Sequence, residues 1–142
     1  MNVDISQGSS GPSSSRVAVL IVEDETLIRL LAADCLQDAG FEVIAAVNAA
    51  EAIAILESDA HIDFVFTDIM MPGSMNGIGL GAWIRARRPE LPIAFTSGVA
   101  RTSMLALGLR DGDAFFAKPV TFDGLVRHIH ATLPMLQAAA AT

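Results

Sequence analysis

Five short apolar segments alternate with longer segments of helical pattern, and this alternation limits the folds open to the chain more than any other feature. Apolar runs of this length are typical of strands buried on both faces of a parallel sheet. The predicted strands are 17–22, 41–45, 64–67, 92–96 and 114–117. The sequence therefore predicts a sheet whose consecutive strands are joined by helices.

The segments between and after these runs have apolar residues at helical spacing. The predicted helices are 25–39, 48–58, 76–88, 101–107 and 122–133. Gly40 indicates the end of the first helix, and Asn48 with Glu51 indicates a capped start of the second. Five strand–helix units in a row predict an α/β fold, a three-layer sandwich with right-handed crossovers.

The length of 142 residues suits one domain. Residues 1–15 are Ser-rich without periodicity, which predicts a disordered N-terminal arm. The folded domain is then expected over 16–133, followed by a short Ala-rich tail over 134–142. Because so few residues follow Leu133, we expect no DNA-binding or enzymatic output domain, unless the chain is a fragment of a larger protein.

Composition excludes several classes of protein. Nine Lys and Arg against sixteen Asp and Glu give a net charge of −7, which argues against a nonspecific nucleic-acid binder. No apolar run approaches the roughly 18 residues of a membrane span, and no signal peptide is evident. A single cysteine, Cys35, excludes an internal disulfide and a cysteine-based zinc site. We therefore expect a cytoplasmic protein without membrane or nucleic-acid partners.

Polar side chains that can react or bind ligands follow four of the five predicted strands. They are Glu23 and Asp24 after the first, Asp68 after the third, Thr96 at the end of the fourth and Lys118 after the fifth. The carboxyl ends of parallel strands meet at one edge of the sheet, where ligands of open α/β sheets bind. We therefore expect these groups to gather in one site.

Three neighbouring carboxylates repel one another, so a divalent cation is expected among them. An oxygen-only ligand set with few members favours Mg²⁺. With Lys118 and the Thr96 hydroxyl added, the set suits phosphoryl transfer with Asp68 as nucleophile. The alternative for each acidic residue alone is a role as a helix N-cap.

Four motifs in register resemble the receiver domain of two-component response regulators, over roughly residues 16–133. The motifs are VLIVED at 19–24, TDIMMPGSMNG at 67–77, FTSG at 95–98 and FAKP at 116–119. The resemblance implies a flavodoxin-like fold, with five helices around a five-stranded parallel sheet of order 2-1-3-4-5. That order places the first and third strands side by side, which brings Asp24 to Asp68.

The resemblance also implies residue roles. Asp68 corresponds to the phosphoacceptor, Asp24 to a direct Mg²⁺ ligand, and Glu23 to a residue acting through metal-bound water. The backbone carbonyl of Met70 corresponds to a further ligand, and Lys118 to the lysine that pairs with the phosphoryl group.

Three further residues take their expected roles from the same resemblance. Thr96 matches the switching hydroxyl, and the bond between Lys118 and Pro119 is expected to be cis. Phe115 falls where an aromatic side chain rotates inward on activation. Because Phe115 has no hydroxyl, its part in a switch would rest on packing.

The function implied is a phosphorylation-activated signalling switch. It would accept a phosphoryl group from a histidine kinase or histidine phosphotransfer protein, and act on an unknown downstream protein as a monomer or weak homodimer. It would catalyse only its own phosphorylation and dephosphorylation, so no enzyme activity on a separate substrate is expected. The alternatives are a pseudo-receiver that is never phosphorylated, a receiver fragment of a hybrid histidine kinase, and an aspartyl-phosphate phosphatase. The phosphatase class would have an Asp where this chain has Met70.

Overall fold

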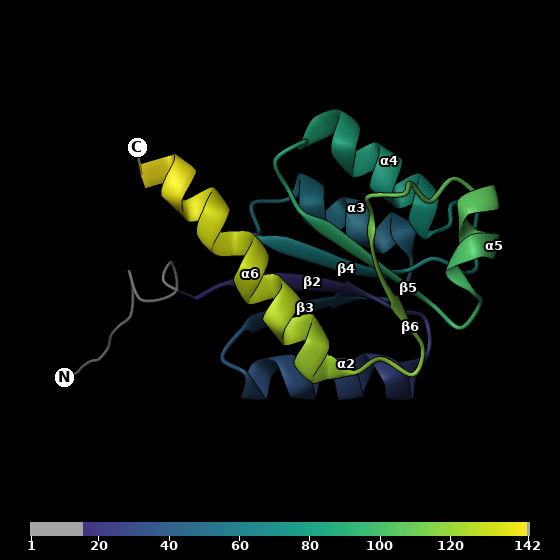
Figure 1. The fold of residues 1–142 in the computed structure, drawn as a ribbon, viewed down its shortest axis with the longest axis horizontal. Helices are drawn as coiled ribbons and strands as arrows, with labels where there is room; N and C mark the ends of the chain where they lie inside the picture. Colours follow the sequence, from purple (N-terminus) through teal and green to yellow (C-terminus); the bar gives the residue numbers. More distant parts are fainter. Residues whose placement is uncertain (1–15, 142) are drawn as a thin grey trace.

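The computed structural model describes residues 16–141, so the predicted disordered arm over 1–15 lies outside the described residues. Strands and helices alternate along the described chain (Figure 1). In chain order they are β2 (Ala18–Val22), α2 (Thr26–Asp38), β3 (Glu42–Ala46), α3 (Ala49–Glu57), β4 (Phe64–Asp68), α4 (Gly77–Arg87), β5 (Ile93–Ser97), α5 (Arg101–Ala106), β6 (Ala114–Ala117) and α6 (Phe122–Ala141). The predicted alternation is confirmed.

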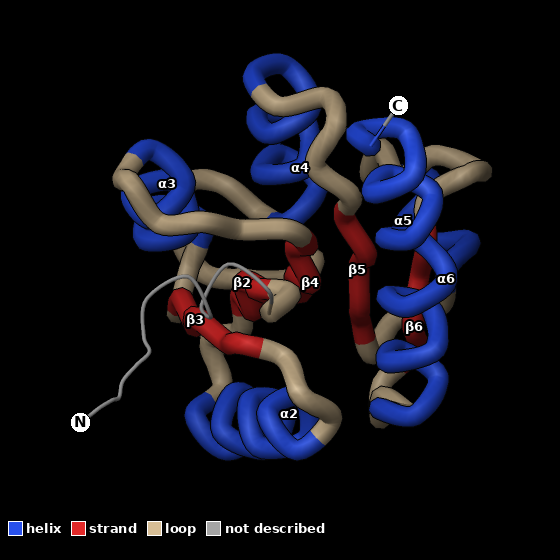
Figure 2. Tube along the Cα trace, turned by 90° about the vertical axis from the view of Figure 1, so that its left-hand side faces the viewer, coloured by secondary structure: helices blue, strands red, loops and turns tan. Residues whose placement is uncertain are grey.

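The five strands form one parallel sheet of order β3-β2-β4-β5-β6, which is the predicted 2-1-3-4-5 order (Figure 2). β2 and β4 are therefore neighbours at the centre, although a strand and two helices separate them in sequence. Their register places Val22 beside Thr67, and the next pair of strands places Asp68 beside Thr96. All carboxyl ends lie along one edge of the sheet.

The core has one layer on each face of the sheet. On one face, α2 and α6 bury apolar side chains such as Leu36 and Ile129 against the strands. On the other face, α3 and α4 do the same with Leu56 and Leu80 (Figure 1). Burying side chains of this size contributes about 1.5–3 kcal/mol each. The two layers hold the strands rigidly and leave the carboxyl edge to carry polar groups.

Two predicted helix boundaries are confirmed by their hydrogen bonds or backbone geometry. The Asn48 side chain accepts the Glu51 N–H at 2.8 Å, and the Glu51 carboxylate accepts the Val47 N–H at 2.9 Å. The first bond satisfies a donor that the first turn of a helix leaves free, and the second holds the residue before the N-cap. Gly40 follows α2 with φ of +99°, a left-handed conformation that favours glycine.

Two sequence expectations are wrong. Helix α6 does not end at Leu133 but continues to Ala141, where Leu, Gln and Ala favour a helix although Pro134 does not. The strands are also not all buried on both faces. β3 and β6 are largely half-buried or exposed, because each forms an edge of the sheet.

Within residues 16–141, no helix is both long and apolar enough to cross a bilayer.

Candidate functional site

Three carboxylates meet at the carboxyl ends of the two central strands. Glu23 and Asp24 directly follow β2, and Asp68 is the last residue of β4. One oxygen from each side chain lies within 4.8 Å of the others. We call these three residues the acidic cluster. Their expected proximity is confirmed, and it follows from β2 and β4 being adjacent in the sheet.

Lys118 reaches the acidic cluster from β6, beyond the intervening strand β5. Its ammonium group donates hydrogen bonds to the Glu23 and Asp68 carboxylates, both at 3.0 Å. The Lys118 backbone N–H donates to the carbonyl of Ser97 at the end of β5, which anchors the residue beside the site. The Lys118–Pro119 peptide bond is cis, as the resemblance implies.

Burial sets the electrostatics of the site. Glu23 and Asp68 are each 4% exposed, whereas Asp24 is exposed. Burial raises the pKa of both buried carboxyls, against the opposing effect of their hydrogen bonds with Lys118. Burial also acts to lower the pKa of Lys118, but its bonds to Asp68 and Glu23 hold that pKa above the ordinary value. Lys118 is therefore a charged partner for the two carboxylates at neutral pH.

The donor set of the acidic cluster fits a hard divalent cation. Three carboxylates face a single lysine, so the site has an excess of negative charge in a largely buried setting. Asp24 is the exposed member and is accessible to a hydrated ion arriving from solvent. Oxygen ligands in small number are the environment that Mg²⁺ takes while retaining several waters. The cluster can therefore hold such a metal ion.

Thr96 lies beside Asp68 but its hydroxyl is engaged elsewhere. The two residues are paired in the β4–β5 register, and Thr96 is 2% exposed. The Thr96 hydroxyl donates to the carbonyl of Phe116 on β6 at 2.6 Å. In this conformation the predicted switching hydroxyl ties β5 to β6.

Phe115 packs between the sheet and α5. It is half-buried and packs against a small apolar cluster that includes Phe95 and Met104. The Arg101 guanidinium lies 5.9 Å from the centre of its ring. Phe115 thus makes packing contacts in this conformation, and its part in a switch stays a prediction.

Sequence reasoning missed Arg101. Its guanidinium donates to the backbone carbonyls of Asp111 and Asp113 at 2.6 and 2.9 Å. These bonds fasten the start of α5 to the loop that precedes β6. A single arginine at the start of the predicted helix 101–107 carries no sequence signal for such a contact.

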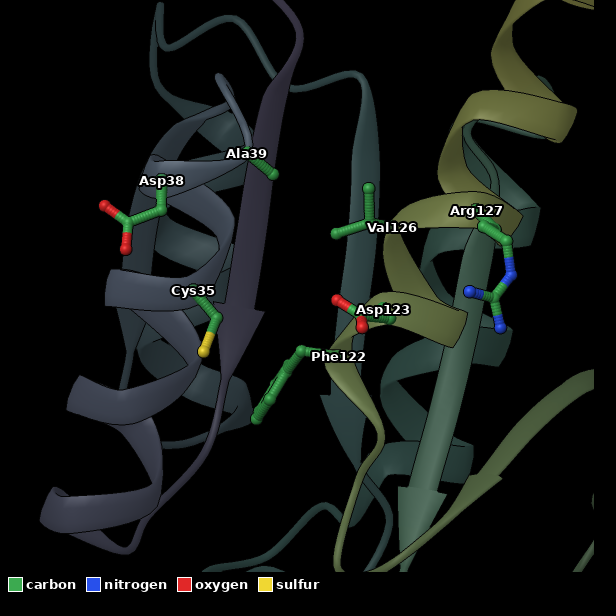
Figure 3. A pocket seen from close by; sticks show the side chains of 7 residues that line it. All are labelled: Cys35, Asp38, Ala39, Phe122, Asp123, Val126 and Arg127. Carbon is green, nitrogen blue, oxygen red and sulfur yellow. The ribbon is translucent and has the colours of Figure 1, made fainter.

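A separate hollow lies between α2 and α6. Figure 3 shows Cys35 of α2 and Phe122 of α6 facing it, with Asp38 and Arg127 at its margins. The lining side chains come from these two helices and the residue after α2, and none belongs to the acidic cluster. The hollow is therefore separate from the acidic cluster at the edge of the sheet.

Comparison with known proteins identifies the family. The family model described as the response regulator receiver domain matches residues 19–130. The chain belongs to this family. The receiver domain is 32% identical over 127 residues to a probable transcriptional regulatory protein of Picosynechococcus sp., covering 84% of this chain and 50% of that relative. It spans half or less of the length of the first curated relatives that it matches.

Solved structures agree with this assignment. A response regulator receiver protein from Sinorhizobium medicae is 32% identical with a TM-score of 0.77, covering 85% of this chain and 97% of that one. The receiver domain of the hybrid histidine kinase CckA is also 32% identical with a TM-score of 0.67, covering 82% and 98%. The chain is therefore a receiver domain of the two-component type in both sequence and fold.

Proposed function

We propose that this receiver domain is a phosphorylation-activated switch that accepts a phosphoryl group on Asp68. One observation carries the proposal. The Asp68 carboxylate ends a central strand, lies within the acidic cluster and is hydrogen-bonded by Lys118 at 3.0 Å. Phosphoryl transfer requires a nucleophile and positive charge beside it. Asp68 is a buried nucleophile, Lys118 is the cation beside it, and Asp24 is the nearby carboxylate proposed to bind the metal.

In the transfer step, an Asp68 carboxylate oxygen attacks the phosphorus of a phosphohistidine. The new O–P bond forms as the N–P bond breaks, and the donor imidazole leaves with the electron pair. Lys118 is positioned to offset the negative charge of the incoming phosphoryl oxygens, while the Met70 N–H, 3.3 Å from the other Asp68 oxygen, orients the carboxylate. Mg²⁺, when held by Asp24, Asp68 and the Met70 carbonyl with Glu23 acting through a bound water, supplies further positive charge.

The proposed donor is a histidine kinase or a histidine phosphotransfer protein, and the proposed output is a contact with another protein. The domain catalyses its own phosphorylation and dephosphorylation and turns over no other substrate. Incubation with acetyl phosphate and Mg²⁺, followed by intact mass measurement, tests this function. We expect one phosphoryl adduct per chain, formed only when Mg²⁺ is present. A chain that stays unmodified would instead support the pseudo-receiver alternative.

The roles of the two adjacent acidic residues lead to a prediction about metal affinity. Asp24→Asn should weaken Mg²⁺ binding more than Glu23→Gln. Asp24 is exposed and is the proposed direct ligand, whereas Glu23 is buried and paired with Lys118. We expect Glu23→Gln to raise the dissociation constant about 10-fold, as for residues that act through an outer shell. Isothermal titration calorimetry measures the Mg²⁺ dissociation constant of each variant. The exposed Asp34→Asn removes the same charge elsewhere and serves as the control. The reverse ranking would exchange the two roles.

Phosphorylation should change the β6–α5 region more than α2. The Thr96 hydroxyl now binds the Phe116 carbonyl, so turning it toward a phosphoryl group releases a bond that holds β6. Arg101 joins α5 to the loop before β6, which extends any such movement to residues 101–109. Amide hydrogen exchange with and without a phosphoryl mimic measures the response. Changes confined to residues 25–60 would contradict this prediction.

A further inference from the structure

We infer that Gly77 is a positioning residue for the reaction at Asp68, an inference that rests on the proposed function. Gly77 is the first residue of α4. A methyl group added at its Cα would lie 2.1 Å from the Asp68 carbonyl oxygen and 2.8 Å from the Ile69 Cα. Both contacts are with backbone atoms of the chain that carries the phosphoacceptor, so no side-chain rotation can relieve them.

Hydrogen bonds and buried side chains hold the start of α4 in place. The Gly77 N–H donates to the Ile69 carbonyl at 2.9 Å, which fastens the helix to the residue after Asp68. The Asn76 side chain accepts the Gly79 N–H at 2.9 Å and caps the helix. Further along, Leu80 and Ile84 are fully buried in the core. Moving the helix away from β4 would break the Gly77–Ile69 bond and expose the buried Leu80 and Ile84 side chains.

The end of β4 is held equally firmly. The Ile69 N–H donates to the Thr96 carbonyl at 2.9 Å, and the Ile69 side chain is fully buried. The Thr67 hydroxyl donates to the Asp68 carbonyl at 2.9 Å. The peptide between Asp68 and Ile69 thus lies between β5 on one side and the helix start on the other. A side chain at Gly77 must displace this peptide or the helix by about 1 Å.

Such a displacement acts on the groups that the reaction uses. Asp68 supplies the nucleophile, and the Met70 carbonyl, two residues on, is the proposed metal ligand on the same short stretch of backbone. Shifts of about 1 Å in reacting groups can cost about 100-fold in rate. The missing side chain of Gly77 therefore sets the position of both groups by letting the helix pack directly on their backbone.

The test compares alanine at three glycines of α4. Gly77→Ala is expected to raise the Mg²⁺ dissociation constant about 10-fold by calorimetry, and to slow phosphorylation by acetyl phosphate at saturating Mg²⁺ by up to about 100-fold. In Gly79→Ala the new methyl lies 2.8 Å from Cγ of the Met75 side chain, which can rotate away. In Gly81→Ala it lies 2.8 Å from the ring of buried Phe95, a side chain and not the backbone that carries Asp68 and Met70. We expect Gly81→Ala to lower the melting temperature and both controls to keep wild-type Mg²⁺ affinity.

Each outcome decides the inference. Equal Mg²⁺ affinity and rate in Gly77→Ala and Gly79→Ala would overturn it, as would losses in Gly77→Ala that match those of Gly81→Ala. If Gly77→Ala does not fold, Asn76→Ala decides, because it loosens the helix start without a clash. Weaker Mg²⁺ binding in Asn76→Ala supports positioning, and unchanged binding contradicts it. A wild-type chain that binds Mg²⁺ but takes no phosphoryl group would count against the proposed function instead.

Discussion

Replacing Asp68 with asparagine is expected to abolish the phosphoryl adduct that acetyl phosphate and Mg²⁺ form on the wild-type chain. An amide oxygen lacks the negative charge that makes the carboxylate a nucleophile. Asp68 is also the member of the acidic cluster that ends a central strand and is hydrogen-bonded by both Lys118 and the Met70 N–H. Intact mass measurement after a fixed incubation shows the loss directly.

A matched variant separates this effect from a general loss of charge. Asp38 is an exposed carboxylate at the end of α2, so Asp38→Asn makes the same chemical change outside the acidic cluster. We expect it to form the adduct at the wild-type rate. An undiminished adduct in Asp68→Asn would mean that another residue accepts the phosphoryl group.

The phosphorylated state is expected to be long-lived because neither residue 70 nor residue 98 has a side chain that can hold a water molecule in line for attack. The side chains two residues beyond Asp68 and Thr96 belong to Met70 and Gly98. Met70 is 51% exposed at the site but carries no hydrogen-bond donor. A side chain added at Gly98 would meet no atom within 4 Å, so this position is open space. Hydrolysis then relies on unpositioned water.

Polar side chains at these two positions should shorten the lifetime. We expect Met70→Asn and Gly98→Glu each to speed dephosphorylation about 10-fold, less than the roughly 10²–10⁴-fold that a fully positioned general acid or base contributes. Phosphate release after removal of the donor measures the decay. Met70→Leu and Gly98→Ala change the same positions without adding a polar group and should decay as the wild type does. If neither polar variant decays faster, water positioning at these sites does not control the lifetime.

The sequence alone predicted the fold because its signals are local. Short apolar runs separated by helical patterns leave few arrangements other than a parallel sheet covered on both faces. Gly40 and Asn48 also act within a few residues of themselves, and their roles at helix ends are confirmed. The end of α6 is an exception, since the core-facing stripe stops at Leu133 while the helix itself continues to Ala141.

The sequence also predicted which residues gather at the site, but not how they are connected. Asp68 and Asp24 follow strands that the sheet order makes neighbours, so their proximity follows from topology. That Lys118 bridges Asp68 and Glu23, and that the Thr96 hydroxyl binds the Phe116 carbonyl, depends on side-chain directions across four strands. Side-chain rotamers are settled by neighbours distant in sequence, and no local pattern encodes them.

The identities of the chemical groups were thus determined by the sequence, and their distances only by the tertiary structure. Residue type and strand-end position were enough to name a nucleophile, two further carboxylates, a lysine and a hydroxyl. Only the packed structure reveals that Gly77 approaches the Asp68 carbonyl so closely that no side chain fits between them. Close packing of α4 on β4 produces that contact, because interiors are packed to a density at which even one methyl group matters.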